Sequence, residues 1–452
     1  MGQLAFIGFV PLVLFPGGSP GRNFFLGTAS GFLFYSLSLS WLYPLAGFLY
    51  LLLPLYLSLY WGLFLCLLFL LPARGRVFTG TFIWFFLEVI VSGMMTGFPW
   101  LLLGLSQWQN GAMLFFAGIA GIYGVSFMVM LANLSIIHLF RKKHLVSCIL
   151  SLMLLAAVPA VSRTRLFRLR PAGSLDIMVV QPDVVSSRIT GPLEAFNSLK
   201  DLTAKSLGEK TPELVIWPEG SLPGVLDEYP EAKREVELMS ASRCLHILFG
   251  TFTRAGEGSY NSAVMIGNRK IQVYRKNHLV PYGEFIPGGR YKAVRDAFEK
   301  IAGYVPDIRH GSGQMPMVLN GKHFGPLICF ENIFPGMTRV LDDNGAGAFM
   351  VITNDSWYGH AGKSQHFAHN FLRAAESRKY FVQAALSGIS GIVPPGGRSI
   401  ISGRNGVETG EGPGVIFYRV PLMEGRSLYS RTGDMPLFLA GVFLMGALIC
   451  RR

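Results

Sequence analysis

Three reactive side chains of different types lie at or just beyond the ends of apolar runs in the sequence. Glu219 ends one run, Lys276 directly follows a second, and Cys329 lies near the end of a third. Strand ends are where α/β sheets place ligands and reactive groups. A carboxylate, an amine and a thiol suffice for acyl transfer. The thiol attacks a carbonyl carbon, the carboxylate takes the thiol proton, and the ammonium group stabilises the oxyanion and the thiolate.

Each of these residues, taken singly, also has a structural interpretation. A cysteine inside an apolar run is more often a small core residue than a nucleophile. Glu219 follows a Trp-Pro pair and could equally begin a helix as its first acidic residue. A lone lysine such as Lys276 is most often solvated. The sequence contains no CxxC or histidine-rich metal pattern, so we expect neither a metal ion nor another cofactor.

The local sequences around the three residues are more specific than the residues themselves. In chain order they are Val215-Ile216-Trp217-Pro218-Glu219, then Tyr274-Arg275-Lys276-Asn277-His278-Leu279-Val280-Pro281-Tyr282-Gly283-Glu284, then Leu327-Ile328-Cys329-Phe330-Glu331. Together they resemble the nitrilase (carbon–nitrogen hydrolase) superfamily. The resemblance implies an αββα sandwich in which Glu219 is the general base, Lys276 the oxyanion-stabilising cation and Cys329 the nucleophile.

The charge distribution divides the chain into an apolar part and a water-soluble part. Only 15% of the residues are charged, against about 25% in a typical soluble domain. The charged residues before Arg141 are few: Arg22, Arg74, Arg76 and Glu88. From about Arg163 to Arg431 the composition is that of an ordinary soluble domain. We therefore expect a membrane region and a domain outside the membrane.

A bilayer core of about 30 Å is crossed by roughly 20 apolar residues in a helix. On this measure we predict seven spans, at 1–16, 23–43, 46–72, 78–97, 111–140, 144–162 and 434–450. The fifth is too long for one straight crossing, and its glycines Gly118, Gly121 and Gly124 could allow a break. The predicted fold is an α-helical transmembrane bundle at 1–165, an α/β nitrilase-type domain at 172–425 and a C-terminal transmembrane helix at 430–452.

Short basic loops predict the orientation of the bundle. Every second loop carries basic residues, and the loops at 44–45 and 98–110 carry no charge. Positive loops stay in the cytoplasm, so residues 163–433 are expected in the periplasm. The basic loop residues are Arg22, Arg74, Arg76, Arg141, Lys142, Lys143, His144, Arg451 and Arg452. The net charge of +13 therefore reflects membrane topology, and because no basic patch interleaved with aromatics is present, no nucleic-acid partner is expected.

The outer domain has the pattern of strands alternating with helices. Its runs are continuously apolar, which is typical of a sheet covered on both faces. We predict strands at 175–182, 214–219, 246–251, 262–266, 270–275, 324–330 and 348–353, and helices at 192–208, 230–243 and 363–380.

The membrane half narrows the resemblance to one family. Thr96-Gly97-Phe98-Pro99-Trp100, Gly121-Ile122-Tyr123-Gly124-Val125-Ser126-Phe127 and Asn354-Asp355-Ser356-Trp357-Tyr358-Gly359 occur in order, followed by a final apolar helix. This layout resembles the apolipoprotein N-acyltransferase family over nearly the full chain. The resemblance implies a monomeric, multi-pass enzyme of the bacterial inner membrane with a periplasmic catalytic domain. By the same resemblance, we expect it to move a phospholipid acyl chain, through a cysteine thioester, to the α-amino group of a diacylglyceryl-cysteine on a lipoprotein.

Further residues match this pattern. Glu284 and Glu331 are expected to support the catalytic groups, although Glu331 could instead cap a helix after the strand. Phe330, Trp357 and Tyr358 are expected to line the acyl-chain site, with core packing as the alternative. Glu88 lies in a predicted span, where a carboxylate is costly and marks either function or hydrogen bonding between spans.

Two other classes of protein remain open. A membrane-anchored nitrilase-family amidase or hydrolase would share the triad and give its acyl group to water. A non-catalytic membrane scaffold or transporter would carry an inactive nitrilase-like domain. The number of apolar spans argues against the first, and the intact Glu219, Lys276 and Cys329 argue against the second. The stretch Ala384–Ser390 resembles a Thr-Asn-Thr-Gly-Ile-Ser sequence of the family with its first polar residues changed.

Overall fold

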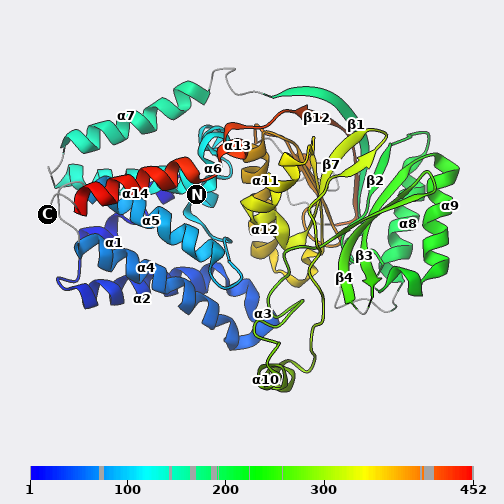
Figure 1. Ribbon diagram of the computed structural model, residues 1–452, viewed down its shortest axis with the longest axis horizontal. Helices are drawn as coiled ribbons and strands as arrows, with labels where there is room; N and C mark the ends of the chain where they lie inside the picture. Colours follow the sequence, from blue (N-terminus) through cyan, green and yellow to red (C-terminus); the bar gives the residue numbers. More distant parts are fainter. Residues whose placement is uncertain are drawn as a thin grey trace.

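The computed structural model describes residues 2–70, 76–141, 145–162, 169–184, 191, 193–222, 224–256, 258–397, 400–401 and 412–449. A helical region made of the N-terminal part of the chain and its last helix lies beside an α/β sandwich (Figure 1). This arrangement confirms the predicted fold class.

The helical region is built from the apolar runs of the sequence. Its helices are α1 (Val10–Leu14), α2 (Pro20–Ser38), α3 (Tyr43–Ala46), α4 (Leu52–Leu70), α5 (Arg76–Gly93), α6 (Gly111–Phe140), α7 (Leu145–Ser162) and α14 (Met435–Ile449). Polar residues mark helix starts: the side chain of Ser19 accepts a hydrogen bond from Arg22 N before α2, and that of Asn110 accepts one from Met113 N before α6. These caps satisfy backbone donors that the first helical turn leaves free.

Within the described residues, three helices in the region of the seven predicted spans are long and apolar enough to cross a membrane. They are Ser40–Leu70, Arg76–Gly93 and Gly111–Phe140. Among the described residues, Gly2–Leu14, Cys148–Ser162 and Met435–Ala447 form shorter apolar helices. Helix α2 begins with a polar turn and is less apolar than these three. The single span predicted at 1–16 is divided between a short 3₁₀ helix, Gly2–Phe6, and α1.

The long helix α6 bends where the sequence predicts a break. Gly121 has φ +68° and ψ −176°, which is not helical and which a residue with a side chain rarely adopts. A Cβ atom at this position would lie 2.3 Å from the ring of Tyr429, so glycine is required for space as well as for conformation.

The sandwich contains two six-stranded sheets packed face to face. The first has the order β12-β1-β2-β3-β4-β5, and the second β11-β10-β9-β8-β7-β6. The first is formed by β12 (Gly414–Glu424), β1 (Arg170–Gln181), β2 (Leu214–Ile216), β3 (His246–Ala255), β4 (Gly258–Gly267) and β5 (Lys270–Arg275). The second is formed by β11 (Ile400–Ile401), β10 (Gly391–Val393), β9 (Phe381–Ala385), β8 (Phe349–Thr353), β7 (Lys322–Ile328) and β6 (Met317–Leu319).

Helices cover the outer faces of both sheets and complete the αββα arrangement. Helices α8 (Glu194–Leu207) and α9 (Pro230–Arg243) pack on the first sheet, and α11 (Pro335–Asp343) and α12 (His360–Ser377) pack on the second. Helix α12 also contacts α6, so it lies between the sandwich and the helical region (Figure 1). Helix α10 (Lys292–Ala302) lies in the segment between β5 and β6, and α13 (Leu428–Thr432) lies between β12 and α14.

The central strands bring the predicted reactive groups together. The strands β7, β8 and β9 run parallel, as do β1, β2 and β3, and their central residues are fully buried. Glu219 follows β2, Lys276 follows β5 and Cys329 follows β7. The ends of β2, β5 and β7 lie at the same side of the sandwich, because Lys276 lies close to Glu219 and both interact with the Cys329 thiol.

Candidate active site

Lys276 lies between two carboxylates at the end of β5. Its Nζ donates to Glu284 Oε1 at 2.9 Å and lies 3.8 Å from Glu219 Oε1. The amide of Asn261 donates to both carboxylates, at 2.7 Å to Glu219 and 2.8 Å to Glu284. Main-chain donors hold the remaining oxygens: Asn354 N binds Glu219, and Val280 N binds Glu284. The lysine is 1% exposed, so its charge is balanced inside the protein.

Cys329 occupies a sharp turn between β7 and a 3₁₀ helix, Cys329–Ile333. Its φ of +50° lies in the left-handed region, which is uncommon for a residue with a side chain and is found at functional sites. The residue is 6% exposed. Its thiol interacts electrostatically with Glu219 and Lys276, so the structure brings all three predicted catalytic groups into one site.

Glu331 joins the turn that contains Cys329 to the loop that follows Lys276 through hydrogen bonds. One carboxylate oxygen accepts from Asn277 N at 2.7 Å and His278 N at 3.2 Å, and the other accepts from Ile328 N at 2.8 Å. The hydroxyl of Tyr274 donates to the same carboxylate. The bond to Ile328 is that of a capping acid, so both interpretations of Glu331 describe part of its geometry.

Replacing Glu331 with glutamine should loosen both catalytic loops. An amide has one accepting oxygen, and its NH₂ group would face backbone N–H donors. Leaving a buried donor without a partner costs about 1–3 kcal/mol. We expect a lower free energy of unfolding in detergent and a clearly lower acyl-transfer rate. Tyr274→Phe removes only one donor and is the matched control. Equal effects of the two substitutions would contradict a role for the carboxylate in joining the loops.

Burial and neighbouring charges set the protonation of the site. Burial raises the pKa of Glu219 above its usual value, and Lys276 partly opposes this rise. Although burial alone would lower the pKa of Lys276, Glu284 and Glu219 raise it above its ordinary value. Burial and Glu219 raise the pKa of Cys329 well above that of a free thiol, and Lys276 opposes them. The resting site therefore holds a charged lysine, a protonated thiol and a carboxylate suited to accept the proton as the thiol attacks.

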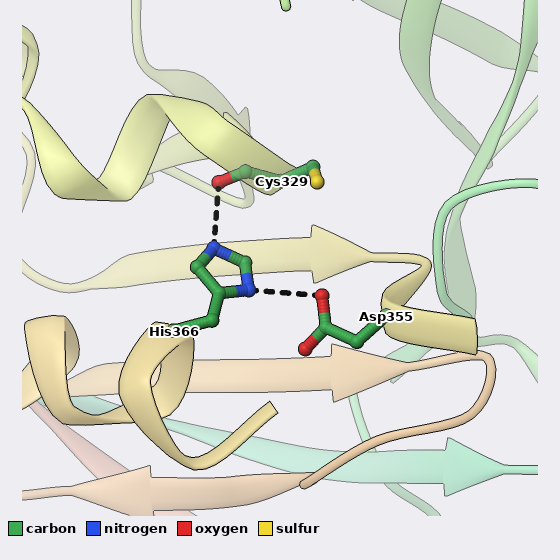
Figure 2. A group of neighbouring side chains, drawn as sticks. All are labelled: Cys329, Asp355 and His366. Atoms are coloured by element: carbon green, nitrogen blue, oxygen red, sulfur yellow. Dashed lines mark hydrogen bonds and ion pairs between the residues drawn. The ribbon is translucent and has the colours of Figure 1, made fainter. Parts of the chain in front are cut away.

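A buried histidine–aspartate pair adjoins Cys329; the sequence places Asp355 in the motif 354–359 and His366 shortly after it, but assigns neither a role. His366 Nδ1 lies 2.9 Å from Asp355 Oδ1, and His366 Nε2 lies 3.3 Å from the carbonyl oxygen of Cys329 (Figure 2). A ligating atom of each side chain lies within 4.8 Å of the others, a spacing that a metal ion could also use. No histidine-based metal spacing was visible in the sequence, because Cys329, Asp355 and His366 come from three separate elements.

Two of the three predicted aromatic residues lie in one cluster around Trp100. Phe330 stacks with Trp100 at a centroid distance of 6.3 Å, and Tyr358 meets the same ring at 5.7 Å. Trp41 contacts both Trp100 and Tyr358. Trp357 is 56% exposed and lies outside this cluster. The sequence missed Trp41 and Trp100, although Trp100 belongs to the Thr96–Trp100 motif that pointed to the family.

Two segments of the helical region, the one between α2 and α3 and the one between α5 and α6, are fixed to the catalytic domain by hydrogen bonds. Gln365 Oε1 accepts from the indole N–H groups of Trp41 at 3.0 Å and Trp100 at 2.8 Å. His369 Nε2 lies 3.1 Å from the carbonyl oxygen of Trp100, and His278 Nε2 lies 3.0 Å from that of Thr96. Since a carbonyl only accepts, both histidines donate here. The helical region therefore contributes rings to the site.

Glu88 is held inside the helical region by ordinary structural bonds. It accepts from the indole of Trp84 at 3.0 Å and from Leu103 N at 2.7 Å. Within the residues that the structure describes, Glu88 has no ion-pair partner. These contacts match the second of the two interpretations, hydrogen bonding between segments.

Comparison with known proteins covers both parts of the chain. Residues 179–422 match the carbon-nitrogen hydrolase family model, and residues 1–135 match the apolipoprotein N-acyltransferase N-terminal domain. Among curated proteins, an apolipoprotein N-acyltransferase from Caulobacter vibrioides is 30% identical, with 87% of this chain and 77% of that protein covered. Another, from Geobacter metallireducens, is 28% identical over 99% of this chain and 91% of its own length.

Solved structures of the nitrilase superfamily also match. A carbon-nitrogen hydrolase from Helicobacter pylori G27 is 15% identical with a TM-score of 0.42, covering 60% of this chain and 94% of that one. An amidase from a Nesterenkonia species is 17% identical with a TM-score of 0.39, covering 60% of this chain and 98% of that one.

Proposed function

Because the chain belongs to the apolipoprotein N-acyltransferase family, we propose that it moves a phospholipid acyl chain to the α-amino group of a diacylglyceryl-cysteine on a lipoprotein. The observation that carries the proposal is the position of Cys329. Its thiol lies with Glu219 and Lys276 on one side, while the rings of Phe330 and Trp100 continue from it into the helical region. A nucleophile in this position serves a substrate with a reactive ester and a long apolar chain.

The first step makes a thioester. As the sulfur of Cys329 attacks the ester carbonyl carbon of the phospholipid, its proton passes to Glu219. The developing oxyanion is stabilised by the ammonium group of Lys276. The carbon–oxygen ester bond then breaks, and Glu219 returns the proton to the leaving alcohol oxygen. The products are a lysophospholipid and an acyl chain bound to Cys329.

The second step uses the same groups in the reverse sense. The α-amino group of the acceptor attacks the thioester carbonyl carbon, and Glu219 takes a proton from the nitrogen. The carbon–sulfur bond breaks, and the proton returns to the sulfur of Cys329. Glu284 keeps Lys276 in place during both steps. One of its oxygens accepts from Lys276 Nζ, and the other accepts from Val280 N, which fixes the position of the carboxylate. Phe330, Tyr358 and Trp100 line the path of the acyl chain.

A membrane-anchored amidase is the second candidate, and the acceptor distinguishes the two. We predict that release of lysophospholipid beyond one turnover requires a diacylglyceryl-cysteine peptide, because without the amine the thioester stays on Cys329. Purified protein with phospholipid alone should release one equivalent, measured by mass spectrometry of the lipid products. Rapid release of free fatty acid over many turnovers without peptide would instead support the hydrolase.

The proposed reaction also requires the sandwich to lie on the periplasmic side of a bacterial inner membrane. The basic loops predict this side, but Arg74, Lys142, Lys143, His144, Arg451 and Arg452 lie outside the described residues. We predict that a reporter active only outside the cytoplasm is active when fused after Gly433 and silent when fused after Lys143. The reverse pattern would contradict both the topology and the lipoprotein substrate.

A further inference from the structure

The pair formed by His366 and Asp355 takes part in no step of the reaction above, yet it adjoins the nucleophile. His366 comes from α12, and Asp355 comes from the turn after β8. Both are completely buried, and Figure 2 shows the imidazole between the Asp355 carboxylate and the main chain of Cys329. Thr353, the last residue of β8, also binds the pair, because its hydroxyl donates to Asp355 Oδ1 at 2.7 Å.

The nitrogen Nε2 of His366 must carry a hydrogen. It lies 3.3 Å from the carbonyl oxygen of Cys329, which can only accept, and 2.9 Å from Asn332 Oδ1. The orientation of the Asn332 amide is fixed by a chain of buried amides that ends on another main-chain carbonyl. In that chain Asn332 donates to Asn370, Asn370 donates to Gln383, and Gln383 donates to the carbonyl oxygen of Ile389.

The other ring nitrogen requires a second proton. Nδ1 of a neutral imidazole with a hydrogen on Nε2 presents a lone pair, and an ionised carboxylate also presents only lone pairs. Nδ1 and Asp355 Oδ1 are nevertheless 2.9 Å apart in the protein interior. Two acceptors do not approach to this distance without a hydrogen between them. A proton therefore lies between the two groups, on the nitrogen or on the oxygen.

We propose that His366 and Asp355 share one proton, carry no net charge together, and thereby protect the Cys329 thiolate from the Asp355 carboxylate while fixing the turn that holds the sulfur. His366 is a positioning residue on this view. It acts through the Cys329 carbonyl and through the charge of Asp355, and it does not touch the substrate. The inference rests on the proposed function only in taking Cys329 as the nucleophile.

The other titratable groups around the pair are Tyr358, His369, Glu219 and Lys276. Tyr358, whose ring lies 6.0 Å from that of His366, has its pKa raised well above the usual value by burial and by Cys329 and Asp355, so it stays protonated. Burial, Arg373 and His366 lower the pKa of His369 well below its usual value, so that ring stays neutral. Glu219 and Lys276 act on the thiol from the first sheet.

The test measures the thiolate of Cys329 by its rate of alkylation. Full-length protein in detergent is treated with iodoacetamide between pH 6 and pH 9, and the peptide containing Cys329 is quantified by mass spectrometry. The peptide of the exposed Cys244 is the internal reference. His366→Gln keeps an amide N–H group for Asn332 and the Cys329 carbonyl, but it leaves the Asp355 charge without a proton. Asp355→Asn removes that charge, and the amide of this variant can itself donate a hydrogen to His366 Nδ1, so the shared proton is no longer required.

We expect His366→Gln to slow alkylation near neutral pH by about tenfold or more, because one pKa unit on the thiol changes its thiolate fraction tenfold. Asp355→Asn should stay within about threefold of the original protein. The double variant His366→Gln/Asp355→Asn should recover most of the rate that His366→Gln loses, which mere damage to packing would not allow. His369→Gln removes an equally buried histidine of α12 that faces a carbonyl, and it should not shift the pH profile.

Three results would overturn the proposal. The first is an Asp355→Asn rate about tenfold above that of the original protein, which would mean that the carboxylate carries an unbalanced charge. The second is normal alkylation in His366→Gln, and the third is no recovery in the double variant. Alkylation needs neither phospholipid nor peptide, so failure of the proposed acyl transfer would be seen separately and would leave this result standing.

Discussion

Protein with Cys329 replaced by alanine should form no acyl adduct with phospholipid and should transfer no acyl chain to a lipopeptide. In the proposed mechanism the sulfur holds the acyl chain between the two steps, and no other nucleophile in the described site can replace it. We expect a loss of roughly 10⁴-fold or more, as for a triad that acts as a unit. Intact-mass measurement after incubation with phospholipid detects the adduct directly.

Two further cysteine variants sharpen this experiment. Cys329→Ser keeps a hydroxyl, which is far less nucleophilic near neutral pH, and it should be nearly inactive while a slow ester accumulates. Cys244→Ala changes an exposed cysteine away from the site and should behave like the original protein. Acyl transfer by Cys329→Ala at a rate near that of the original protein would show that the proposed mechanism is wrong.

Replacing Glu219 with glutamine should block thioester formation while phospholipid binding remains. The amide cannot take the thiol proton, and a positioned general base contributes about 10²–10⁴-fold. Burial raises the pKa of this carboxyl, so the rate in the original protein should fall as the pH drops below that raised value, at a higher pH than for an ordinary glutamate. Adduct formation in a single turnover, followed from pH 5 to pH 8, measures both effects.

Glu284 provides a matched control for Glu219. Both carboxylates face the same lysine nitrogen and the same Asn261 amide, but Glu284 is tied by Val280 N. Glu284→Gln should therefore lower the rate by less than Glu219→Gln, because Lys276 is still present and the base is intact. If Glu284→Gln were the more damaging change, the assignment of the base to Glu219 would have to be reversed.

The proposed triad could be predicted from the sequence because its residues lie in short, local motifs at the ends of apolar runs. Lys276 follows the predicted strand 270–275, whereas Glu219 and Cys329 lie at the ends of the predicted strands 214–219 and 324–330; in the structure β2 ends at Ile216 and β7 at Ile328, so all three residues follow their strands. The strand β12 escaped prediction although its apolar and polar residues partly alternate, since its pairing partner β1 lies more than 200 residues earlier. Such pairing depends on the tertiary fold and leaves no local signal.

The parts of the site that the sequence missed are those built across long separations. Asp355 lies in the motif 354–359 and His366 follows it, but the sequence does not show that the two side chains contact each other or that His366 lies next to the main chain of Cys329. Gln365 and Trp41 lie 324 positions apart and are joined by one hydrogen bond. The bend of α6 at Gly121 could be predicted because glycine is a local signal. The ring of Tyr429, which packs against Gly121, comes from a distant part of the chain and could not be predicted.

That bend determines whether the catalytic domain can be produced by itself. Ile122, which follows the bend, donates its main-chain N–H to the buried carboxylate of Glu376 at 2.8 Å, and Arg378 of the same region donates to the Phe115 carbonyl oxygen. A truncated chain that begins after α7 would uncover Glu376, Gln365 and the rings that now pack on Trp100. Such a fragment would lose Trp41 and Trp100, which we propose to line the acyl-chain site, and would expose buried apolar side chains to water. Structural and kinetic work therefore needs the full-length protein in a detergent or lipid disc.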